Sequence, residues 1–341
     1  SSKVIRVIIA KEKQTHLDFA KEIKAAKRVF TIGSGTAGAA AAQIAYFLRA
    51  VAKINAVSLV GADAFEYLDL FGAGDLIIAP SQSGETADTL NAIREAKRRG
   101  MLTLGIVNVT GSTIAREVDA GIYNHVGPET AVASTKASVS QVLLQMMFAL
   151  YLARMRGLSK SEGQTLIKEM QKLPTYAEKI LASAGDIKRL AKKYKKTENF
   201  FCLGRKYNVS SALEGALKLK ECSYIHVEGG NIAELKHGPI SLIDKNFPSI
   251  VIAPKDSMYE KNKSSIQEIK ARKGLVIAIT TEGNKELAKI ADTVLYIPKT
   301  LEMLTPILAF IPMQLFAYYL AVERGNDVDK PRNLAKSVTV E

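Results

Sequence analysis

Short hydrophobic runs alternate with longer segments of mixed polarity along most of this chain. In the first half, runs of four to seven mainly apolar residues are bounded by Gly, Pro and polar residues, and they predict buried strands at 29–32, 56–60, 76–79, 102–108 and 121–124. The segments 38–51, 86–99 and 134–156 between them predict helices. This alternation is typical of a parallel sheet with helices on both faces, so we predict an α/β fold.

The second half of the chain repeats the first. Matching segments are offset by 168 to 174 residues, and the pairs are 30–33 with 201–204, 77–80 with 251–254, 119–123 with 292–296, and Gly157 with Gly325. Such a repeat predicts two tandem flavodoxin-like subdomains. We place them at 1–157 and 158–325, where Lys-rich connecting helices open the second, and we assign 326–341 to a C-terminal tail that closes the active site.

Composition narrows the possible partners. A length of 341 residues suits two domains, and a net charge of +13 permits an anionic partner. The lysines are scattered over polar helix faces, as at Lys192-Lys193, and no nucleic-acid motif accompanies them, so we predict an anionic small molecule and no nucleic acid. Cys202 and Cys222 make no metal motif and read as core residues. We recognise no signal peptide and no charge-free run of membrane-spanning length, so we expect a cytoplasmic protein outside the membrane.

The most informative loop follows the third predicted strand. Ser81, Gln82, Ser83, Gly84 and Thr86 lie where this strand turns into the N-terminus of a helix. Backbone N–H groups and the positive end of the helix dipole favour an anion there, and the hydroxyl groups add neutral donors. No lysine follows as in a nucleotide P-loop, so a phosphate monoester is the better ligand. The alternative is that Ser83 and Thr86 only cap the helix.

Two other loops follow strands in the same way. The corresponding loop of the second half, 254–258, reads Pro-Lys-Asp-Ser-Met and lacks the hydroxyl cluster, which predicts one phosphate site per chain. The glycine-rich loop 33–38 has the glycine spacing of a dinucleotide fingerprint, and Asp63 lies near the position where that fold needs an acid. A dinucleotide site is therefore a weaker alternative for this loop.

Ionisable residues that could transfer protons gather in the second half. Glu214, Lys218 and Glu221 are four and three residues apart, so they share one face of a predicted helix. A solvent-exposed ladder of salt bridges is the ordinary interpretation of this spacing. The chain then reaches a turn that carries His237 beside Gly-Pro, so an acid–base set is the competing interpretation.

The tail also carries candidate chemistry. Arg332 suits an anionic sugar and Lys336 suits carbonyl chemistry, although an irregular tail is also typical of a frayed terminus. None of the four histidines is paired at the spacing of metal ligands. Because a proton can move between adjacent carbons without a metal or a redox cofactor, we predict neither.

Five segments together resemble the isomerase part of the glucosamine-6-phosphate synthase family (glutamine–fructose-6-phosphate aminotransferase), in which a SIS-type phosphosugar-binding domain occurs twice. The resemblance covers about residues 29–341, and the segments are 81–86, 132–136, 212–221, 234–239 and 332–341. The loop 81–86 alone indicates only a SIS domain. The helix, the His-containing turn and the tail together indicate the synthase.

The resemblance implies how the substrate is bound. It implies that the phosphate of fructose 6-phosphate is bound by Ser81, Gln82, Ser83 and Thr86. It implies that the rest of the sugar is contacted by Ser34, Val132, Ser134 and Ala335. Glu214 and Arg332 are implied as supporting groups. The family also implies a homodimer.

The resemblance implies the chemistry as well. Glu221 would move a proton between C1 and C2 of the sugar, and Lys218 would assist near the C1 oxygen. His237 would come from the partner subunit and open the sugar ring. Lys336 would form a Schiff base with C2, which ammonia displaces, and isomerisation would then give glucosamine 6-phosphate.

The chain also departs from the family. It begins Ser1-Ser2-Lys3 without the glutamine-using domain and its N-terminal cysteine, so we expect an isomerase domain that is either cut from a longer protein or uses free ammonia, and a glutaminase domain is a possible partner. Gly35 stands where a hydroxyl residue is expected. The alternatives are a fructosamine-phosphate deglycase or glucosamine-6-phosphate deaminase of the same superfamily, and a non-catalytic sugar-phosphate sensor. A sensor would have no use for Glu221 and Lys336.

Overall fold

The computed structural model describes residues 25–339, which form two compact units. Unit 1 contains the described residues up to Gln171 together with 335–339, and unit 2 runs from Lys172 to Leu334. The domain limits predicted at 157 and 325 stay a prediction, because these units are defined by contacts and not by the sequence repeat.

A five-stranded parallel sheet forms the centre of unit 1, in the order β2-β1-β3-β4-β5. The strands are β1 (Val29–Gly33), β2 (Ala56–Val60), β3 (Leu76–Ser81), β4 (Leu102–Val107) and β5 (Ala120–Tyr123). β1 and β3 are buried along their whole length, as expected of parallel strands covered on both faces. β3 runs two residues further than predicted, so Pro80 and Ser81 still pair with β4.

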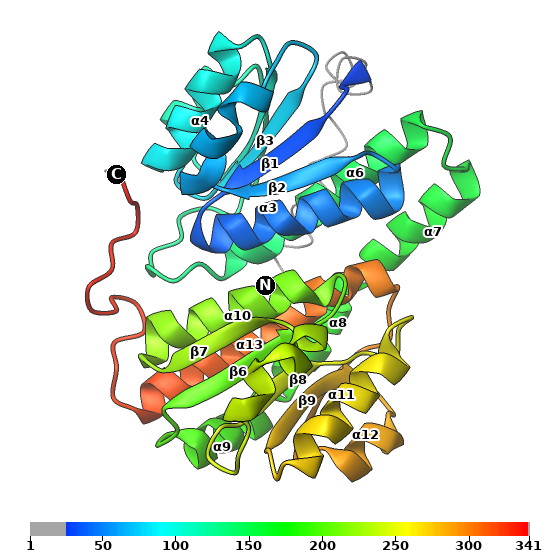
Figure 1. Cartoon of the computed structure of the whole chain (residues 1–341), viewed down its shortest axis with the longest axis vertical. Coiled ribbons are helices and arrows are strands. Elements are labelled where there is room, and N and C mark those ends of the chain that lie inside the picture. The colour runs from blue at the N-terminus through cyan, green and yellow to red at the C-terminus, as the bar shows by residue number, and fades with distance from the viewer. Residues whose placement is uncertain (1–24, 340–341) are drawn as a thin grey trace. The chain divides into compact units, whose positions relative to one another are not determined.

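Helices cover both faces of this sheet (Figure 1). The helices of unit 1 are α3 (Gly35–Phe47), α4 (Ala87–Arg98), α5 (Thr113–Glu117), α6 (Lys136–Met155) and α7 (Lys160–Met170), with the π-helical turn η2 (Leu48–Ala52) and the 3-10 segment η3 (Ala62–Leu70). Alternate side chains of β1 show the two faces. Ile32 packs in one cluster with Ile93 of α4, whereas the Thr31 hydroxyl donates to the Ala41 carbonyl of α3 at 2.7 Å.

Unit 2 repeats the architecture of unit 1. Its parallel sheet has the order β7-β6-β8-β9-β10, which is the order of the first sheet. The strands are β6 (Asn199–Gly204), β7 (His226–Asn231), β8 (Ser249–Ile252), β9 (Val276–Thr281) and β10 (Thr293–Ile297). The predicted α/β fold of two tandem flavodoxin-like subdomains is therefore confirmed.

Two long helices form the core of unit 2 on one side of its sheet. The helices of this unit are α8 (Leu173–Ala182), α9 (Ala184–Tyr194), α10 (Asn208–Ser223), α11 (Tyr259–Ala271), α12 (Lys285–Ile290) and α13 (Thr305–Glu323), with 3-10 turns η4 (Ile232–His237), η5 (Pro239–Leu242) and η6 (Glu302–Leu304). α10 and α13 lie against each other so closely that a Cβ at Gly215 would be 1.6 Å from Met313 Cε. The helix face that α10 presents to α13 is thus fixed by a glycine.

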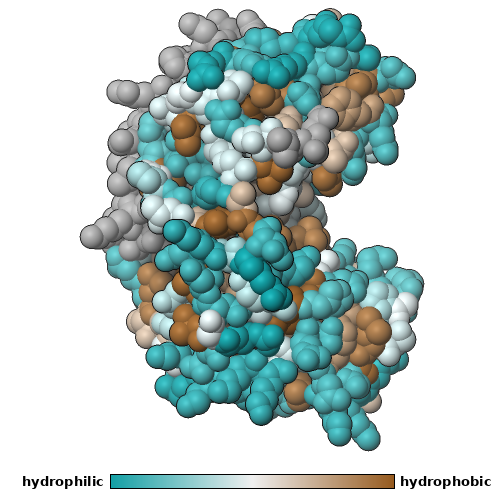
Figure 2. Space-filling view, turned by 90° about the vertical axis from the view of Figure 1, so that its left-hand side faces the viewer, coloured by the Kyte–Doolittle hydropathy of each residue, from teal (hydrophilic) through white to brown (hydrophobic). Residues whose placement is uncertain are grey.

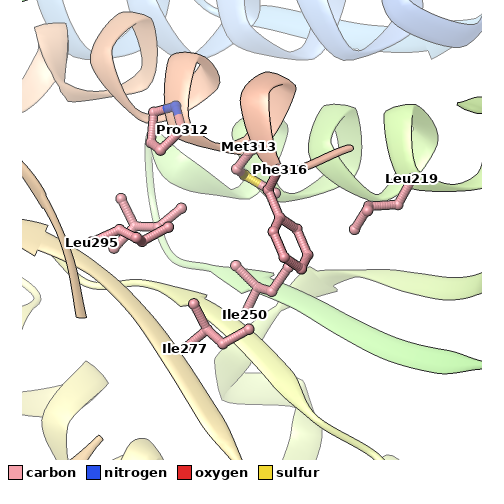
Figure 3. A pocket seen from close by; sticks show the side chains of 8 residues that line it. Leu219, Ile250, Ile277, Leu295, Pro312, Met313 and Phe316 are labelled. Carbon is pink, nitrogen blue, oxygen red and sulfur yellow. The ribbon is translucent and has the colours of Figure 1, made fainter. Parts of the chain in front are cut away.

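The α13 side chains nearest the sheet are closely packed. Figure 3 shows Met313 and Phe316 pointing toward Ile250 and Ile277 of the strands, with Leu219 of α10 beside them. The cavity between them measures only about 10 Å³. An apolar space of this size is a minor packing defect, so the core holds α10 firmly on the sheet.

The expectation that the chain has no charge-free run of membrane-spanning length is wrong. Residues 303–322 carry no charged side chain, and both α6 and the segment Glu302–Glu323 are long and apolar enough to cross a membrane. Their apolar windows are 83% and 72% buried inside the structure, which is what core helices show. The charge-free run exists because these helices are covered on most of their circumference by their own unit.

The lysines of α9 are exposed and both cysteines are buried, as predicted. In α9, Ile187 and Leu190 are buried whereas Lys192 and Lys193 are exposed, and hydrophilic residues cover much of each unit on the face seen in Figure 2. Cys202 and Cys222 are free and buried, and burial raises the pKa of Cys222 to about 11. Both thiols therefore pack as core residues.

Candidate active site

The loop predicted to bind phosphate lies at the carboxyl end of β3, in the middle of the first sheet. Open parallel sheets bind ligands beyond this edge. The buried Ser81 hydroxyl accepts a hydrogen bond from the Gly84 N–H at 2.9 Å, and the Ser83 hydroxyl accepts one from the Glu85 N–H at 3.2 Å. These two bonds fold the loop into a tight turn ahead of α4, with Gln82 half-buried at its tip.

The structure shows a second reason why position 84 is a glycine, beyond the close approach of an anion. Its φ of +69° lies in the left-handed region, and a Cβ at this position would be 2.0 Å from Ser112 Oγ. Only glycine combines this backbone conformation with this contact. The glycine therefore shapes the turn as well as leaving room for an anion.

The alternative hypothesis is that Ser83 and Thr86 only cap the helix. Neither side chain makes a capping hydrogen bond to α4. Thr86 is the N-cap residue of α4, but its side chain does not accept from the first turn, and Ser83 bonds within the loop. Glu85 turns away, and its carboxylate accepts the Thr113 N–H at 2.8 Å. Hydrogen bonds from the Thr113 side chain and backbone hold the pKa of Glu85 below its ordinary value. The Ser83 and Thr86 hydroxyl groups therefore lie just before α4 without capping it.

Ser34 lies at the carboxyl end of β1, the strand next to β3. It is the N-cap residue of α3 without a capping bond, and its buried Oγ has no hydrogen-bond partner among residues 25–339. A buried hydroxyl group rarely lacks a partner, so a ligand group is a reasonable acceptor or donor for it. Asp63, the acid of the dinucleotide alternative, is an exposed residue of η3.

The segment before α6 contains a residue that sequence reasoning missed. The Glu129 carboxylate is buried, and its Oε1 accepts the N–H groups of Thr135 at 2.9 Å and Ala137 at 3.1 Å. Its Oε2 accepts the Ser134 hydroxyl at 2.9 Å. An acid shortly before a hydroxyl pair that opens a long helix was the available signal, since such residues satisfy the first-turn N–H groups.

Lys336 of the tail belongs to unit 1 and lies against this same segment. Its ammonium donates to the Ala131 carbonyl at 2.7 Å and is 3.4 Å from Glu129 Oε2 and 3.5 Å from the Val132 carbonyl. Two residues further on, the Val338 carbonyl accepts the Ala87 N–H of α4 at 3.3 Å. The tail therefore brings Lys336 to the edge of unit 1 that carries the hydroxyl loop and Ser134.

The α10 residues predicted to share one face do so, and this face is not a solvent-exposed ladder. The side chains of Glu214 and Lys218 are 1% and 2% exposed, and that of Glu221 is 19% exposed. The Lys218 ammonium is 3.6 Å from Glu214 Oε1 and donates a short hydrogen bond to Glu221. Burial of three charges together is costly unless they compensate one another, which the alternation of signs provides.

This arrangement shifts the pKa of Lys218. Burial, the largest single influence, would lower that pKa, but the charges of Glu214 and then Glu221, with the hydrogen bond to Glu221, raise it above its ordinary value. Lys218 is therefore an ammonium group at neutral pH. Glu221 beside it is the carboxylate of this cluster that is partly exposed.

The remaining predicted site residues, His237 and Arg332 of unit 2 and Ala335 of unit 1, are exposed. His237 is exposed at the end of η4, and no hydrogen bond or ion pair within the described residues joins it to the α10 cluster. The Arg332 guanidinium lies over the Tyr224 ring at 4.2 Å, and the Arg332 N–H donates to the Tyr224 hydroxyl at 2.8 Å. Ala335 is exposed in the segment of the tail assigned to unit 1.

The corresponding loop of unit 2 is closed by its own side chains. Asp256 accepts the Met258 N–H at 2.8 Å, and the Lys206 ammonium pairs with Glu302 at 2.6 Å and donates to Ser257 at 2.9 Å. The Ser257 hydroxyl and the Lys206 ammonium are thus bonded to each other and to Glu302. This arrangement supports the prediction of one phosphate loop per chain.

Comparison with known families decides the class of protein. The SIS domain family matches residues 22–151 and 193–324, which are the two halves of the repeat. The chain belongs to the SIS domain family. Each SIS match covers one of the two parallel sheets described above, so the sequence repeat, the fold and the family agree.

Curated relatives place this double SIS protein more closely. Glutamine–fructose-6-phosphate aminotransferase (isomerizing) from Chlorobaculum tepidum is 46% identical over 325 residues, which are 95% of this chain and 53% of the relative. The enzyme of the same name from Thermus thermophilus is 45% identical over 97% of this chain and 55% of its own length. The chain spans about half the length of the curated relatives it matches.

Solved structures lead to the same branch of the SIS family. The C-terminal domain of glucosamine-fructose-6-phosphate aminotransferase from Francisella tularensis is 30% identical, with a TM-score of 0.92, over 96% of this chain and 95% of that domain. A glucosamine-6-phosphate deaminase from Thermotoga maritima is 25% identical, with a TM-score of 0.75, over 99% of both chains. The chain is thus similar to this C-terminal domain over 96% of its own length.

Proposed function

We propose that this chain is a sugar-phosphate isomerase that converts fructose 6-phosphate, with ammonia, to glucosamine 6-phosphate. The observation that carries the proposal is the buried Glu214–Lys218–Glu221 cluster, in which one carboxylate stays within reach of a ligand. A carboxylate that can accept and return a proton is what an aldose–ketose interconversion requires. The names of the curated relatives support the same reaction.

The first unit supplies the binding groups in this proposal. Ser81, Ser83 and Thr86, with Gln82 and the start of α4, hold the phosphate, because their hydroxyl groups lie where β3 turns into the N-terminus of α4. The unpartnered Ser34 hydroxyl and the Val132–Ser134 segment contact sugar hydroxyl groups. Lys336 forms the Schiff base with C2 that ammonia displaces, and Ala335 contacts the sugar through the tail.

The second unit supplies the proton-transfer groups. Glu221 carries the proton between C1 and C2, and Lys218, kept as an ammonium group, stabilises negative charge that develops on the C1 oxygen. Glu214 compensates Lys218 from the buried side, and Arg332 supports the tail from its position on Tyr224. We further propose a cytoplasmic homodimer in which His237 of one chain opens the sugar ring for the other.

An ammonium-dependent assay tests the proposal. The chain is incubated with fructose 6-phosphate, with and without an ammonium salt, and glucosamine 6-phosphate is quantified by mass spectrometry. We expect product only with ammonium, and interconversion of fructose and glucose 6-phosphates without it. If neither product forms from protein that is folded and binds the substrate, the proposal is wrong.

The same assay separates the alternatives. Faster release of ammonia from glucosamine 6-phosphate than its synthesis at high ammonium would favour a deaminase. Faster turnover of a fructosamine phosphate than of fructose 6-phosphate would favour a deglycase. Binding of sugar phosphate without turnover of any substrate would favour a sensor. The source of ammonia is tested by adding glutamine in place of the ammonium salt, and product formed from glutamine would show that the protein does not depend on free ammonia.

A further inference from the structure

We infer that Glu129 is a positioning residue for Lys336, which it holds beside the sugar-binding segment and whose positive charge it balances. This inference rests on the proposed function, because it concerns the Schiff base that Lys336 forms. It adds a residue that neither the sequence motifs nor the resemblance assigned. All the contacts that support it lie within unit 1.

The two oxygens of Glu129 have different partners. Oε1 accepts the N–H groups of Thr135 and Ala137 in the first turn of α6, which is an ordinary structural role at a helix N-terminus. Oε2 instead accepts the Ser134 hydroxyl at 2.9 Å and lies 3.4 Å from Lys336 Nζ. One half of the carboxylate thus supports the fold, and the other half faces the two residues proposed to act on the sugar.

Burial of Glu129 strengthens its electrostatic interaction with Lys336. Its side chain is 3% exposed and that of Lys336 is 28% exposed. A buried carboxylate interacts with a neighbouring ammonium group more strongly than an exposed one, since water screens it less. Among residues 25–339, Lys336 is the cation that forms an ion pair with Glu129.

The carboxylate also fits the charge balance of the reaction. Nζ of the Lys336 ammonium must first give up one proton, because only the neutral amine has the lone pair that attacks the C2 ketone. The Nζ–C2 bond then forms, and the C2–O bond breaks as the oxygen takes up protons and leaves. Two of the three ammonium protons leave with the oxygen as water, and the third stays on the protonated imine. The positive charge is therefore on Nζ before and after the step, so one fixed carboxylate balances both forms.

Holding Lys336 in place also contributes directly to the rate. A lysine side chain has four rotatable carbon–carbon bonds. Fixing it near the reacting carbonyl lowers the conformational entropy that must be lost before the reaction. The carbonyls of Ala131 and Val132 orient the ammonium, and Glu129 keeps it against them. The phosphate loop is separate from this group, so loss of Glu129 should change the chemical step more than substrate binding.

The test is reductive trapping of the Schiff base in the full chain. Protein is mixed with saturating fructose 6-phosphate and cyanoborohydride, and the adduct is followed by intact mass and mapped by peptide mass spectrometry. We expect the parent to form an adduct on Lys336. Glu129→Gln should form it about tenfold more slowly or less, with a KM for fructose 6-phosphate within about threefold of the parent.

The variants are chosen to separate charge from structure. Glu129→Gln keeps an oxygen for the Thr135 and Ala137 N–H groups and replaces the oxygen that faces Lys336 with an amide nitrogen. Glu129→Asp keeps the charge on a shorter side chain and should recover part of the trapping rate. Glu117→Gln, which alters a carboxylate that is bonded to Arg94 elsewhere in unit 1, should trap at the parental rate.

Each outcome of this experiment supports or overturns the positioning role of Glu129 or the proposed function. Parental trapping by Glu129→Gln, or equal slowing by Gln and Asp, would overturn the positioning role and leave Glu129 as a structural group of α6. Formation of glucosamine 6-phosphate by the parent without an adduct on Lys336 would overturn it as well. Absence of both adduct and product in the parent would instead count against the proposed function.

Discussion

Lys218 is the residue whose surroundings differ most from those of an ordinary helical lysine. It is buried between Glu214 and Glu221, and these two carboxylates raise its pKa although burial opposes them. A buried charge cluster is stable only while its signs alternate. Removal of the ammonium would leave two like charges close together on one helix face.

We therefore expect Lys218→Met to lower the free energy of unfolding by about 3–5 kcal/mol, the usual cost of removing one partner of a buried ion pair. Lys220→Met is the matched control, since Lys220 is an exposed residue of the same helix. Urea unfolding followed by circular dichroism measures both. Equal and small losses in the two variants would show that the buried cluster does not stabilise the fold.

Asp256 gives the second residue-scale prediction, which concerns pH. Burial raises its pKa to about 6 from an ordinary value of 3.8. A group whose pKa is higher in the folded than in the unfolded state stabilises the fold below the unfolded value, and this stabilisation is lost as the pH rises through about 6. Asp256→Asn keeps an acceptor for the Met258 N–H and never ionises. Its stability relative to the parent should therefore increase between pH 4 and pH 8.

Asp327 provides a control of opposite sign. The N–H groups of Lys330 and Asp329 lower its pKa, so its carboxylate stabilises the fold above the unfolded value and this contribution is lost as the pH falls. Asp327→Asn should thus lose stability relative to the parent at pH 8 and approach it at acidic pH. Thermal melts across this pH range measure both variants. The same trend in both would contradict the assignment of Asp256.

At the scale of single elements, the turn between β3 and α4 is the most constrained part of the proposed site. Gly84 has a φ of +69° and leaves no room for a Cβ beside Ser112. Strain of this kind costs roughly 1–3 kcal/mol when another residue is forced into the conformation. Relief of this strain would move Ser112 or the hydroxyl groups that flank the glycine.

We expect Gly84→Ala to raise the KM for fructose 6-phosphate by about tenfold or more, because the displaced loop no longer directs its donors at the phosphate. Gly111→Ala is the control, since a Cβ at Gly111 would meet no atom within 4 Å and the φ of this glycine is not left-handed. Steady-state kinetics measures both. A KM unchanged in Gly84→Ala would show that the loop does not bind the substrate.

The elements also show how far sequence reasoning reaches. Apolar runs located the strands of unit 1 to within about two residues, since buried parallel strands are apolar on both faces. The charge-free run at 303–322 was overlooked, although a core helix enclosed by its own unit needs no polar face. Glu129 was missed because its partners are set by a turn before α6 and by a tail residue far away in sequence.

The spacing of Glu214, Lys218 and Glu221 predicted a shared face but could not decide between exposed and buried charges. That distinction depends on the packing of α10 against α13, which a local pattern does not contain. The loop at Asp256 illustrates the same limit. Its sequence predicted the absence of a hydroxyl cluster, whereas the ion pair of Lys206 with Glu302 joins segments that are far apart in the chain.

At the scale of the whole molecule, a duplicated fold carries two different sets of residues. Both units have the same strand order, yet the hydroxyl loop, Ser34 and Lys336 belong to unit 1, and the buried acid–base cluster belongs to unit 2. Each set performs a part of one reaction in the proposed function. The central claim is that the molecule moves a proton between C1 and C2 of a sugar phosphate through Glu221.

Hydrogen exchange into the sugar tests this claim most directly. Fructose 6-phosphate is incubated with the chain in D₂O without ammonia, and the C1 and C2 positions are followed by NMR. The account predicts deuterium in the sugar together with formation of glucose 6-phosphate by the parent, and a loss of at least about a hundredfold in Glu221→Gln, in line with the contribution of a general base. Exchange and isomerisation at the parental rate in folded Glu221→Gln, or neither deuterium in the sugar nor glucose 6-phosphate from a parent that binds the sugar phosphate, would contradict it.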